Sequence, residues 1–342
     1  LAQFLEYLES GERDPEEIAF MEPQAGGACR AGNIYNLLQR VLYRMAEQGQ
    51  TEYAQIPVIS LNLMGEEKHT GFRITPGLLS GGIAAGCYGD LIMCLYQQVK
   101  PYEQNPGETD RIRSQVEKKL CESIRRHRNG RHTREKNYRY ACEVFSKVPV
   151  KPGKKKRVGI TGEIYMKYSK LGNDDIESFL LRQGMEPYSG GFINYCLYLV
   201  DTERYKAEKY QRNPIMAKAC AFVLHRLCEA QKHLLTVIGE TDRFQTDLPF
   251  PELKEKVQGI LAEGCNTGDG WLIAAEVIQY VEKGCGSVLI LHPFGCLVSH
   301  VCERGILQRL HARFPDVSIL TIEYDYDQSK TLRESRILLA IS

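Results

Sequence analysis

A short apolar run followed by a cysteine-bearing turn and a helix constrains the fold of this chain most. It reads Ser-Val-Leu-Ile-Leu-His-Pro-Phe-Gly-Cys-Leu-Val-Ser-His-Val-Cys-Glu, from Ser287 to Glu303. The part from Val288 to Leu291 has no polar side chain, which is typical of a strand buried inside a parallel sheet, and a helix is expected from Leu297 onward. The stretch therefore predicts an α/β protein with Cys296 in a strand-to-helix turn.

Cys296 is a candidate functional residue because of this position. Ligands of open α/β sheets bind beyond the carboxyl ends of the strands, where a helix start offers free N–H groups and a positive dipole end. We expect such a place to lower the pKa of the thiol and favour the thiolate, which binds metals or attacks electrophiles. The neighbouring Gly295 is then a candidate cofactor contact. The alternative is a cysteine that only fills space, since free cysteines are often buried.

A similar unit is predicted near the start of the chain. A strand over 17–23, a helix with apolar residues three and four apart at Leu37, Leu38, Val41, Leu42 and Met45, and a strand over 56–63 form a βαβ pattern. Cys29 falls in its strand-to-helix turn, and Gly26 and Gly27 before it would let the backbone approach a bulky group. The GxGxxG spacing of a dinucleotide site is missing.

Three regions are expected along the chain. Residues 1–75 form a first α/β lobe, 76–150 a helical connecting segment, and 151–342 a second α/β lobe that follows a proline- and lysine-rich stretch at 148–157. Within the second lobe we expect strands at 157–163, 288–291 and 317–323. Helices are expected over 174–183, 192–210, 214–238, 253–261, 272–283 and 297–314, and a closing helix is expected to run through 338.

Composition narrows the function classes. The chain has 342 residues, with 44 Lys and Arg against 43 Asp and Glu, so its net charge of +1 argues against a protein that coats nucleic acid. We find neither an uninterrupted apolar run of membrane-spanning length nor a signal peptide, which predicts a cytoplasmic protein without a membrane anchor. The start at Leu1 suggests a piece of a longer chain.

Cysteine usage points to thiols rather than disulfides. Twelve cysteines in a protein without an export signal should stay reduced or bind metal, and none of them form a CxxC pair. A metal site would therefore be assembled from distant segments.

Six motifs together resemble a known family. They are Gly26-Gly-Ala-Cys-Arg-Ala-Gly-Asn, Pro57-Val-Ile-Ser-Leu-Asn, Tyr88-Gly-Asp-Leu with Lys100-Pro-Tyr-Glu, Val158-Gly-Ile-Thr-Gly-Glu-Ile-Tyr-Met-Lys-Tyr, Asn266-Thr-Gly-Asp-Gly-Trp and His292-Pro-Phe-Gly-Cys. In this order they are similar to the dehydratase-like region of CoA-substrate-specific enzyme activases. That region is related to the subunits of 2-hydroxyacyl-CoA dehydratases and to double-cubane cluster proteins.

The resemblance implies a fold and a cofactor. Family members have two Rossmann-like lobes with parallel sheets that face a central cleft, and cysteines from three segments hold an iron–sulfur cluster there, either [4Fe–4S] or a double cubane. Cys29 matches the second of these cysteines and Cys296 the third. The first would lie upstream of Leu1, so Cys265, in a glycine-rich turn before a helix, is a candidate substitute.

The resemblance also implies a reaction. An ATP-dependent activase would deliver a low-potential electron to the cluster, which would pass it to a substrate such as a 2-hydroxyacyl-CoA. Double-cubane relatives reduce small molecules instead, and a homodimer is compatible with either. Two departures alter the expected cleft: this chain has Cys296-Leu-Val-Ser-His in place of Cys-Leu-Pro-Asn-His, and Asp325-Tyr-Asp-Gln in place of an Asp-Pro-Gly turn.

Several side chains keep two interpretations. Glu163 could contact the substrate or the cluster surroundings, or cap the next turn. His292 and His300 could tune the protonation of Cys296 or be satisfied core histidines. Cys302, six residues beyond Cys296 on the predicted helix, is expected to point elsewhere and pack in the core.

Two other functions remain open from the sequence. One is a domain that has lost the cluster and serves as a docking or regulatory module for an activase. The other is a thiol enzyme with Cys296 as the nucleophile.

Overall fold

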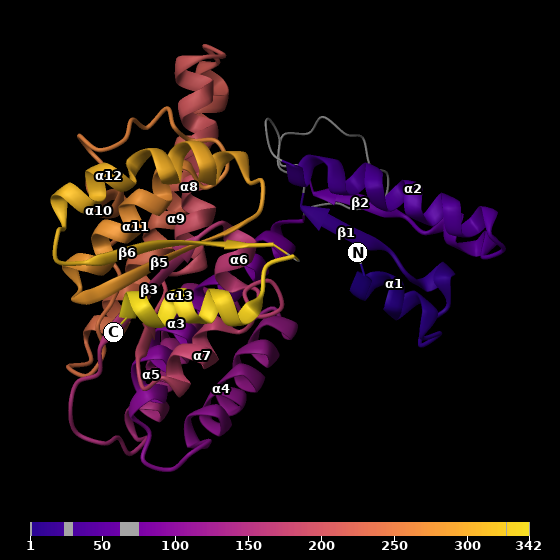
Figure 1. Cartoon of the computed structure of the whole chain (residues 1–342). Helices are drawn as coiled ribbons and strands as arrows, with labels where there is room; N and C mark the ends of the chain where they lie inside the picture. Colours follow the sequence, from indigo (N-terminus) through magenta and orange to yellow (C-terminus); the bar gives the residue numbers. More distant parts are fainter. Residues whose placement is uncertain (1, 24–29, 62–74, 326, 342) are drawn as a thin grey trace. The chain divides into compact units, whose positions relative to one another are not determined.

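The computed structural model describes residues 2–23, 30–61, 75–325 and 327–341. In this part of the chain it has thirteen α-helices and two parallel sheets, which confirms the α/β class (Figure 1). The chain divides into two compact units, Leu1–Ile74 and Thr75–Ser342. Each unit is described by itself below.

The first unit is the predicted βαβ unit with an additional helix. It contains α1 (Ala2–Glu9), β1 (Phe20–Pro23), α2 (Ile34–Glu47) and β2 (Val58–Leu61). The two strands are parallel, with Phe20 opposite Val58. A small core of Leu8, Leu38, Leu42, Tyr53, Ile56 and Val58 holds the unit together. The predicted site residues Cys29, Gly26 and Gly27 lie outside the described residues.

The expected helical segment consists of α3 (Pro76–Val99), α4 (Glu108–Arg125) and α5 (Arg131–Ser146). The chain turns between α4 and α5, where His127 takes a left-handed φ of 54°. All three helices share a hydrophobic core with later parts of the second unit. They therefore belong to the same compact unit as the larger sheet.

Helix α3 is long and apolar. With the turn after it, Pro76–Tyr102 is long and apolar enough to cross a membrane by length and composition, and 39% of its most apolar part is buried inside the structure. Ala84, Cys87, Leu91 and Leu95 are fully buried along one face of the helix, in the core of the unit. Packing in this core thus accounts for part of the apolar composition of α3.

The larger sheet has four parallel strands in the order β4-β3-β5-β6. These are β3 (Arg157–Gly162), β4 (Glu186–Tyr188), β5 (Cys285–Pro293) and β6 (Ser318–Tyr324). Three of the four were expected. The short β4, with Pro187 at its centre, has too few residues for a periodic pattern.

Side chains alternate between two cores on the faces of this sheet. Val288 and Ile290 of β5 join the core that includes α11 (Gly270–Glu282) and α12 (Arg304–Arg313). Leu289 and Leu291 join the other core. That core includes α6 (Ile164–Tyr168), α7 (Ile176–Arg182) and α13 (Lys330–Ile341). Helices therefore cover both faces, as the uninterrupted apolar run of β5 predicted.

Three more helices complete the unit. Helices α8 (Phe192–Lys209) and α9 (Pro214–Gly239) pack against each other, and α10 (Phe250–Glu255) precedes α11. The α8–α9 hairpin extends beyond the rest of its unit, as the salmon segment in Figure 1 shows.

The strand order creates a switch point between β3 and β5. From β3 the chain runs through α6 and α7 to β4 on one side, whereas from β5 it runs through α12 to β6 on the other. At such a point the loops after two neighbouring strands diverge and leave a crevice at their carboxyl ends, where ligands of open α/β sheets bind. Glu163 and Cys296 follow these two strands.

Candidate functional site

The loops after β3 and β5 approach each other closely. Gly162 ends β3 with a φ of 131°, and the backbone N–H of Glu163 donates a hydrogen bond to the Leu291 carbonyl at 2.8 Å. The Glu163 carboxylate accepts a hydrogen bond from the Met166 N–H at 3.0 Å and so caps α6. Of the two interpretations of Glu163, the cap is the one that the described residues display.

Cys296 lies in the predicted turn, and its helix begins at Leu297. Gly295, with a φ of 71°, supplies the left-handed residue of this turn. The Ser299 hydroxyl donates a hydrogen bond to the Cys296 sulfur at 3.3 Å.

The expectation that the helix start lowers the pKa of Cys296 is wrong. Burial raises the pKa of this thiol, and the carboxylates of Glu163 and Asp269 raise it further. The hydrogen bonds from Ser299 oppose the rise but do not reverse it. Without a bound cation, the thiol rather than the thiolate is favoured.

Cys302 lies within range of the charges of both Cys265 and Cys296, and we call Cys265, Cys296 and Cys302 the cysteine group. Burial raises the pKa of Cys302, and the charges of Cys265 and Cys296 contribute to this rise. The loop of Cys265 packs on the helix after Cys296, since a Cβ added to Gly268 would lie 2.8 Å from the Val298 side chain. The structure thus brings the candidates Cys265 and Cys296 to one edge of the sheet.

The expectation that Cys302 points away from Cys296 assumed a regular α-helix, but Ser299–Glu303 forms a π-helical turn. Such turns are wider than an α-helix and are frequent at functional sites. No sequence pattern marked this turn.

Asp269 is a site residue that the sequence reasoning missed. Its side chain is buried, and burial raises its pKa well above the usual value. Repulsion by Glu163 and Glu276 adds to this rise, while Lys167 opposes it. The only available signal was the Gly-Asp-Gly sequence before α11, where Asp269 occupies the N-cap position.

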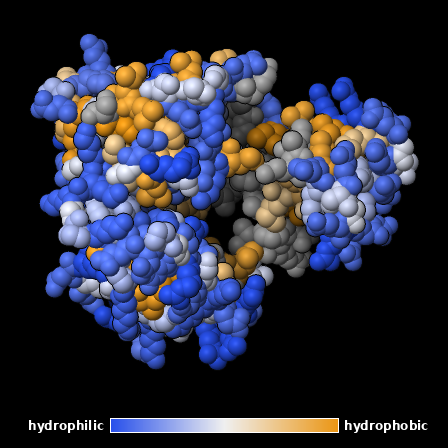
Figure 2. Space-filling view, turned by 60° about the horizontal axis from the view of Figure 1, so that its bottom comes forward, coloured by the Kyte–Doolittle hydropathy of each residue, from blue (hydrophilic) through white to orange (hydrophobic). Residues whose placement is uncertain are grey.

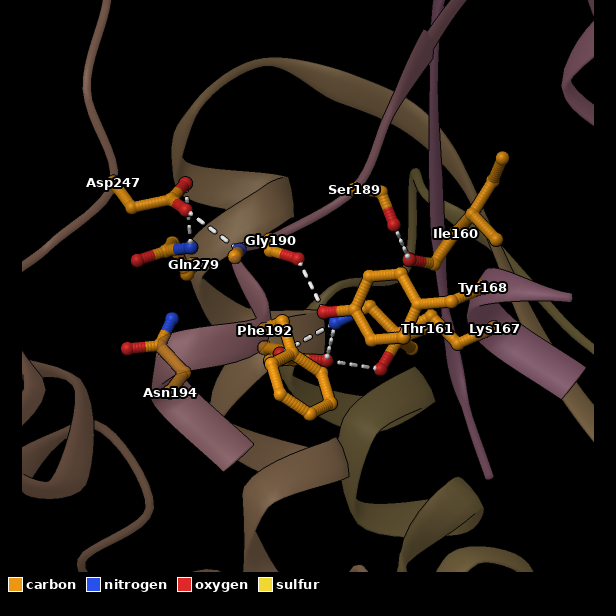
Figure 3. A network of polar contacts seen from close by, with 12 residues as sticks. Ile160, Thr161, Lys167, Tyr168, Ser189, Gly190, Phe192, Asn194, Asp247 and Gln279 are labelled. Atoms are coloured by element: carbon orange, nitrogen blue, oxygen red, sulfur yellow. Dashed lines mark hydrogen bonds and ion pairs between the residues drawn. The ribbon is translucent and has the colours of Figure 1, made fainter. Parts of the chain in front are cut away.

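A buried ion pair lies close to Asp269 and joins β3, α6 and α11. The Lys167 ammonium is 2.7 and 2.9 Å from the two carboxylate oxygens of Glu276, and both side chains are at most 4% exposed (Figure 3). The Thr161 hydroxyl donates a further hydrogen bond to Glu276. The hydroxyl of Tyr168 donates to the Gly190 carbonyl at 2.7 Å, which ties α6 to the loop after β4.

Asp90 of α3 accepts hydrogen bonds from the N–H groups of Phe192 at 2.7 Å and Ile193 at 3.0 Å, at the start of α8. Burial nevertheless raises its pKa from 3.8 to about 7, with a further rise from Asp247 and an opposing effect of Lys167. The folded protein therefore holds this proton more tightly than the unfolded chain does.

We expect a pH dependence of stability from Asp90. Because the folded-state pKa lies above the unfolded-state value, the stabilising contribution is complete below about pH 4 and is lost as the pH rises through about 7. Asp90→Asn, which cannot titrate, should show a smaller decrease of the urea midpoint across this range. Asp316→Asn, at an exposed position, is the matched control. Parallel curves for wild type and Asp90→Asn would contradict the prediction.

The two histidines near Cys296 are not ordinary core residues. His292 is fully buried, and among the described residues its Nε2 has no hydrogen-bond partner. Burial lowers its pKa, so the imidazole is neutral. His292 is thus a core histidine whose Nδ1 lies 3.4 Å from the Pro293 carbonyl oxygen, while its Nε2 has no partner among the described residues.

A cavity of about 230 Å³ lies between α3, α4 and the α6–α7 region, and Tyr96, Arg113, Lys167 and Lys170 contribute to its walls. Pockets for drug-sized ligands span about 300–1,000 Å³. The cavity therefore has room for a small ligand but not for an acyl-CoA.

Of the predicted site residues in the second unit, Cys265, Cys296, Gly295 and Glu163 all follow strands or precede helices at the carboxyl edge of the sheet. Comparison with known proteins adds no assignment: no family model, no curated protein and no solved structure matches this chain.

Proposed function

We propose that this protein is an iron–sulfur redox module of the dehydratase-like type, which receives low-potential electrons from an ATP-dependent activase and passes them to a substrate. The observation that carries the proposal is that Cys265 and Cys296 both lie in loops at the carboxyl edge of the sheet, beside its switch point. In the proposed arrangement, Cys265 and Cys296 bind the cluster together with Cys29, across a cleft between two Rossmann-like lobes.

The surroundings of the cysteine group fit such a cofactor. Thiolates are the usual ligands of iron–sulfur clusters, and cluster potentials depend on hydrogen bonds to sulfur, local charge and burial. Here Ser299 donates to the Cys296 sulfur, and Glu163 and Asp269 lie near the same thiol. These carboxylates would disfavour an added electron and so lower the reduction potential.

Each element at the site has a definite task in this proposal. A bound cluster supplies one-electron transfer to a substrate, which the family resemblance suggests is a 2-hydroxyacyl-CoA. Cys265 and Cys296 hold it, and Gly162 and Gly295 let the two loops approach. The Lys167–Glu276 pair fixes α6 to α11 beneath the site.

Iron analysis of single cysteine variants tests the proposal. Full-length protein reconstituted anaerobically with ferrous iron and sulfide should bind both and turn brown, and Cys296→Ser and Cys265→Ser should each lose most of the iron. Cys121→Ser, at an exposed cysteine of α4, should retain it. A colourless wild-type protein, or equal iron in Cys296→Ser and Cys121→Ser, would contradict the assignment.

The exposed apolar end of α9 favours a second function, a cluster-free docking or regulatory domain of an activase. Ile215 and Phe222 are 81% and 67% exposed on the protruding hairpin. Figure 2 shows that hydrophobic patches interrupt the otherwise hydrophilic surface of the larger unit. Such exposure is typical of interaction surfaces.

For this second function, we expect iron-free protein to bind the activase and Phe222→Ser to weaken that binding. Leu332→Ser, at an exposed leucine of α13, is the matched control. Equal binding by the two variants would exclude α9 as the docking surface.

A further inference from the structure

We propose a second metal site in this protein, in which His292, His300 and Glu323 bind a divalent first-row transition ion such as Zn²⁺ or Fe²⁺. It lies beside the cysteine group but uses none of its sulfur atoms. One ligand atom from each of the three residues lies within 4.8 Å of the other two.

The sheet register places two of the three ligands. His292 of β5 is paired with Glu323 of β6, so their side chains project from the same face of the parallel sheet. Val288 and Ile290 precede His292 by even steps on β5 and pack into the core that includes α12. The π-helical turn that leads into α12 adds His300 on this face.

The distances suit one small ion. The Glu323 Oε2 atom is 3.4 Å from the His300 Nε2 and 3.9 Å from the His292 Nδ1. Metal–ligand bonds of about 2.0–2.2 Å in a tetrahedral site place neighbouring ligand atoms about 3.3–3.6 Å apart. His300 and Glu323 are thus already spaced as ligands, whereas His292 must move closer to Glu323 and exchange its 3.4 Å contact with the Pro293 carbonyl oxygen for the ion.

The donor set indicates the class of ion. Two imidazoles and one carboxylate are the ligands of many catalytic zinc sites and of the ferrous facial triad, both of which leave coordination positions open. Calcium and magnesium prefer sites made of oxygen ligands alone. We therefore expect a transition ion.

Glu303 provides an independent observation. Its side chain is 1% exposed, and among the described residues neither carboxylate oxygen has a hydrogen-bond partner. The Oε1 atom lies 3.8 Å from the Nε2 of His292. Histidines that bind a metal through one nitrogen usually donate the other N–H to a carboxylate. A metal on the His292 Nδ1 would leave the Nε2–H to face Glu303. It would thus explain why the His292 Nε2 and the Glu303 carboxylate are buried without hydrogen-bond partners, which is otherwise costly.

Arg304 competes for the same carboxylate. Its guanidinium lies 3.1 Å from the Glu323 Oε2 atom, and its side chain is 47% exposed. An arriving ion must displace this cation, which can turn into solvent. Removal of the guanidinium should therefore strengthen metal binding, whereas removal of any ligand should weaken it.

Titration of the metal-free full chain with Co²⁺ tests the proposal. Wild type should bind one ion at this site, and His300→Ala and Glu323→Gln should weaken it by about 100-fold or more, since loss of an outer-shell partner alone costs about 10–100-fold. Arg304→Ala should bind more tightly. His311→Ala, at an exposed histidine of α12, should bind like wild type.

Two results would overturn the proposal. One is a titration in which wild type binds no Co²⁺, or in which His300→Ala and Glu323→Gln bind it as tightly as His311→Ala. The other is a thiolate-to-cobalt charge-transfer band that disappears in Cys296→Ser together with all binding, which would place the ion on the cysteine group. Circular dichroism of His300→Ala and Glu323→Gln must match wild type, and both positions retain solvent access, with side chains 32% and 18% exposed.

Discussion

Glu276→Ala should destabilise the Thr75–Ser342 unit by about 3–5 kcal/mol, because it leaves the Lys167 ammonium buried without its partner. The two carboxylate oxygens of Glu276 are the acceptors at 2.7 and 2.9 Å from Lys167, in a region that water does not reach. The Thr161 hydroxyl loses its acceptor in the same variant. Urea unfolding, followed by circular dichroism, measures the loss.

A double variant separates the buried charge from the lost packing. Lys167→Met combined with Glu276→Leu replaces both charges by apolar groups of similar length, and buried pairs replaced in this way often retain their stability. We therefore expect the double variant to be more stable than Glu276→Ala. Glu117→Ala removes a salt bridge with Arg113 that is 40% exposed on both sides and should have little effect. A double variant as unstable as Glu276→Ala would show that the charge is not the cause.

Periodic and apolar segments of this protein are predictable from the sequence. Val288–Leu291 has no polar residue, and the helix after it begins at Leu297 as expected. The apolar spacing between Leu37 and Met45 likewise predicted α2. In such segments local pattern and burial agree, so no knowledge of distant residues is needed. The short β4 has too few residues to show such a pattern and was not predicted.

The chemistry of the site depends on distant parts of the chain. Lys167 and Glu276 are separated by 109 positions, and neither belongs to a motif that predicts an ion pair. Burial raises the pKa of Cys296, and Glu163 and Asp269, from two other loops, raise it further. A position at a strand-to-helix turn predicted where Cys296 lies, but not the charges that surround it.

The pairing of β5 with β6 likewise determines which side chains lie beside His292. His292 was interpreted from its neighbours in sequence, whereas its partner Glu323 comes from β6, which pairs with β5 only in the folded sheet. The π-helical turn that carries His300 and Glu303 has no sequence signature of its own. Local sequence therefore singled out Ser287–Glu303 but could not indicate Glu323, which lies beside it only in the folded sheet.

Gly162→Ala should destabilise the same unit by about 4 kcal/mol or more and disturb both proposed metal sites. Gly162 has a φ of 131°, and an added Cβ would lie 2.0 Å from the Leu291 carbonyl oxygen and 2.4 Å from its nitrogen. These are backbone atoms of β5, which is hydrogen-bonded on both sides and cannot give way as a side chain could. The strand must separate from β3 or the loop before Cys296 must move.

Gly286→Ala is the matched control for this effect. Gly286 also lies in the sheet, on β5, but an added Cβ meets no atom within 4 Å. We expect a urea midpoint close to wild type for Gly286→Ala and a much lower one for Gly162→Ala. If both variants unfold like wild type, the loops after β3 and β5 do not approach each other closely enough at Gly162 to exclude a Cβ. The electrostatic effect of Glu163 on the Cys296 turn depends on this close approach and would then be contradicted as well.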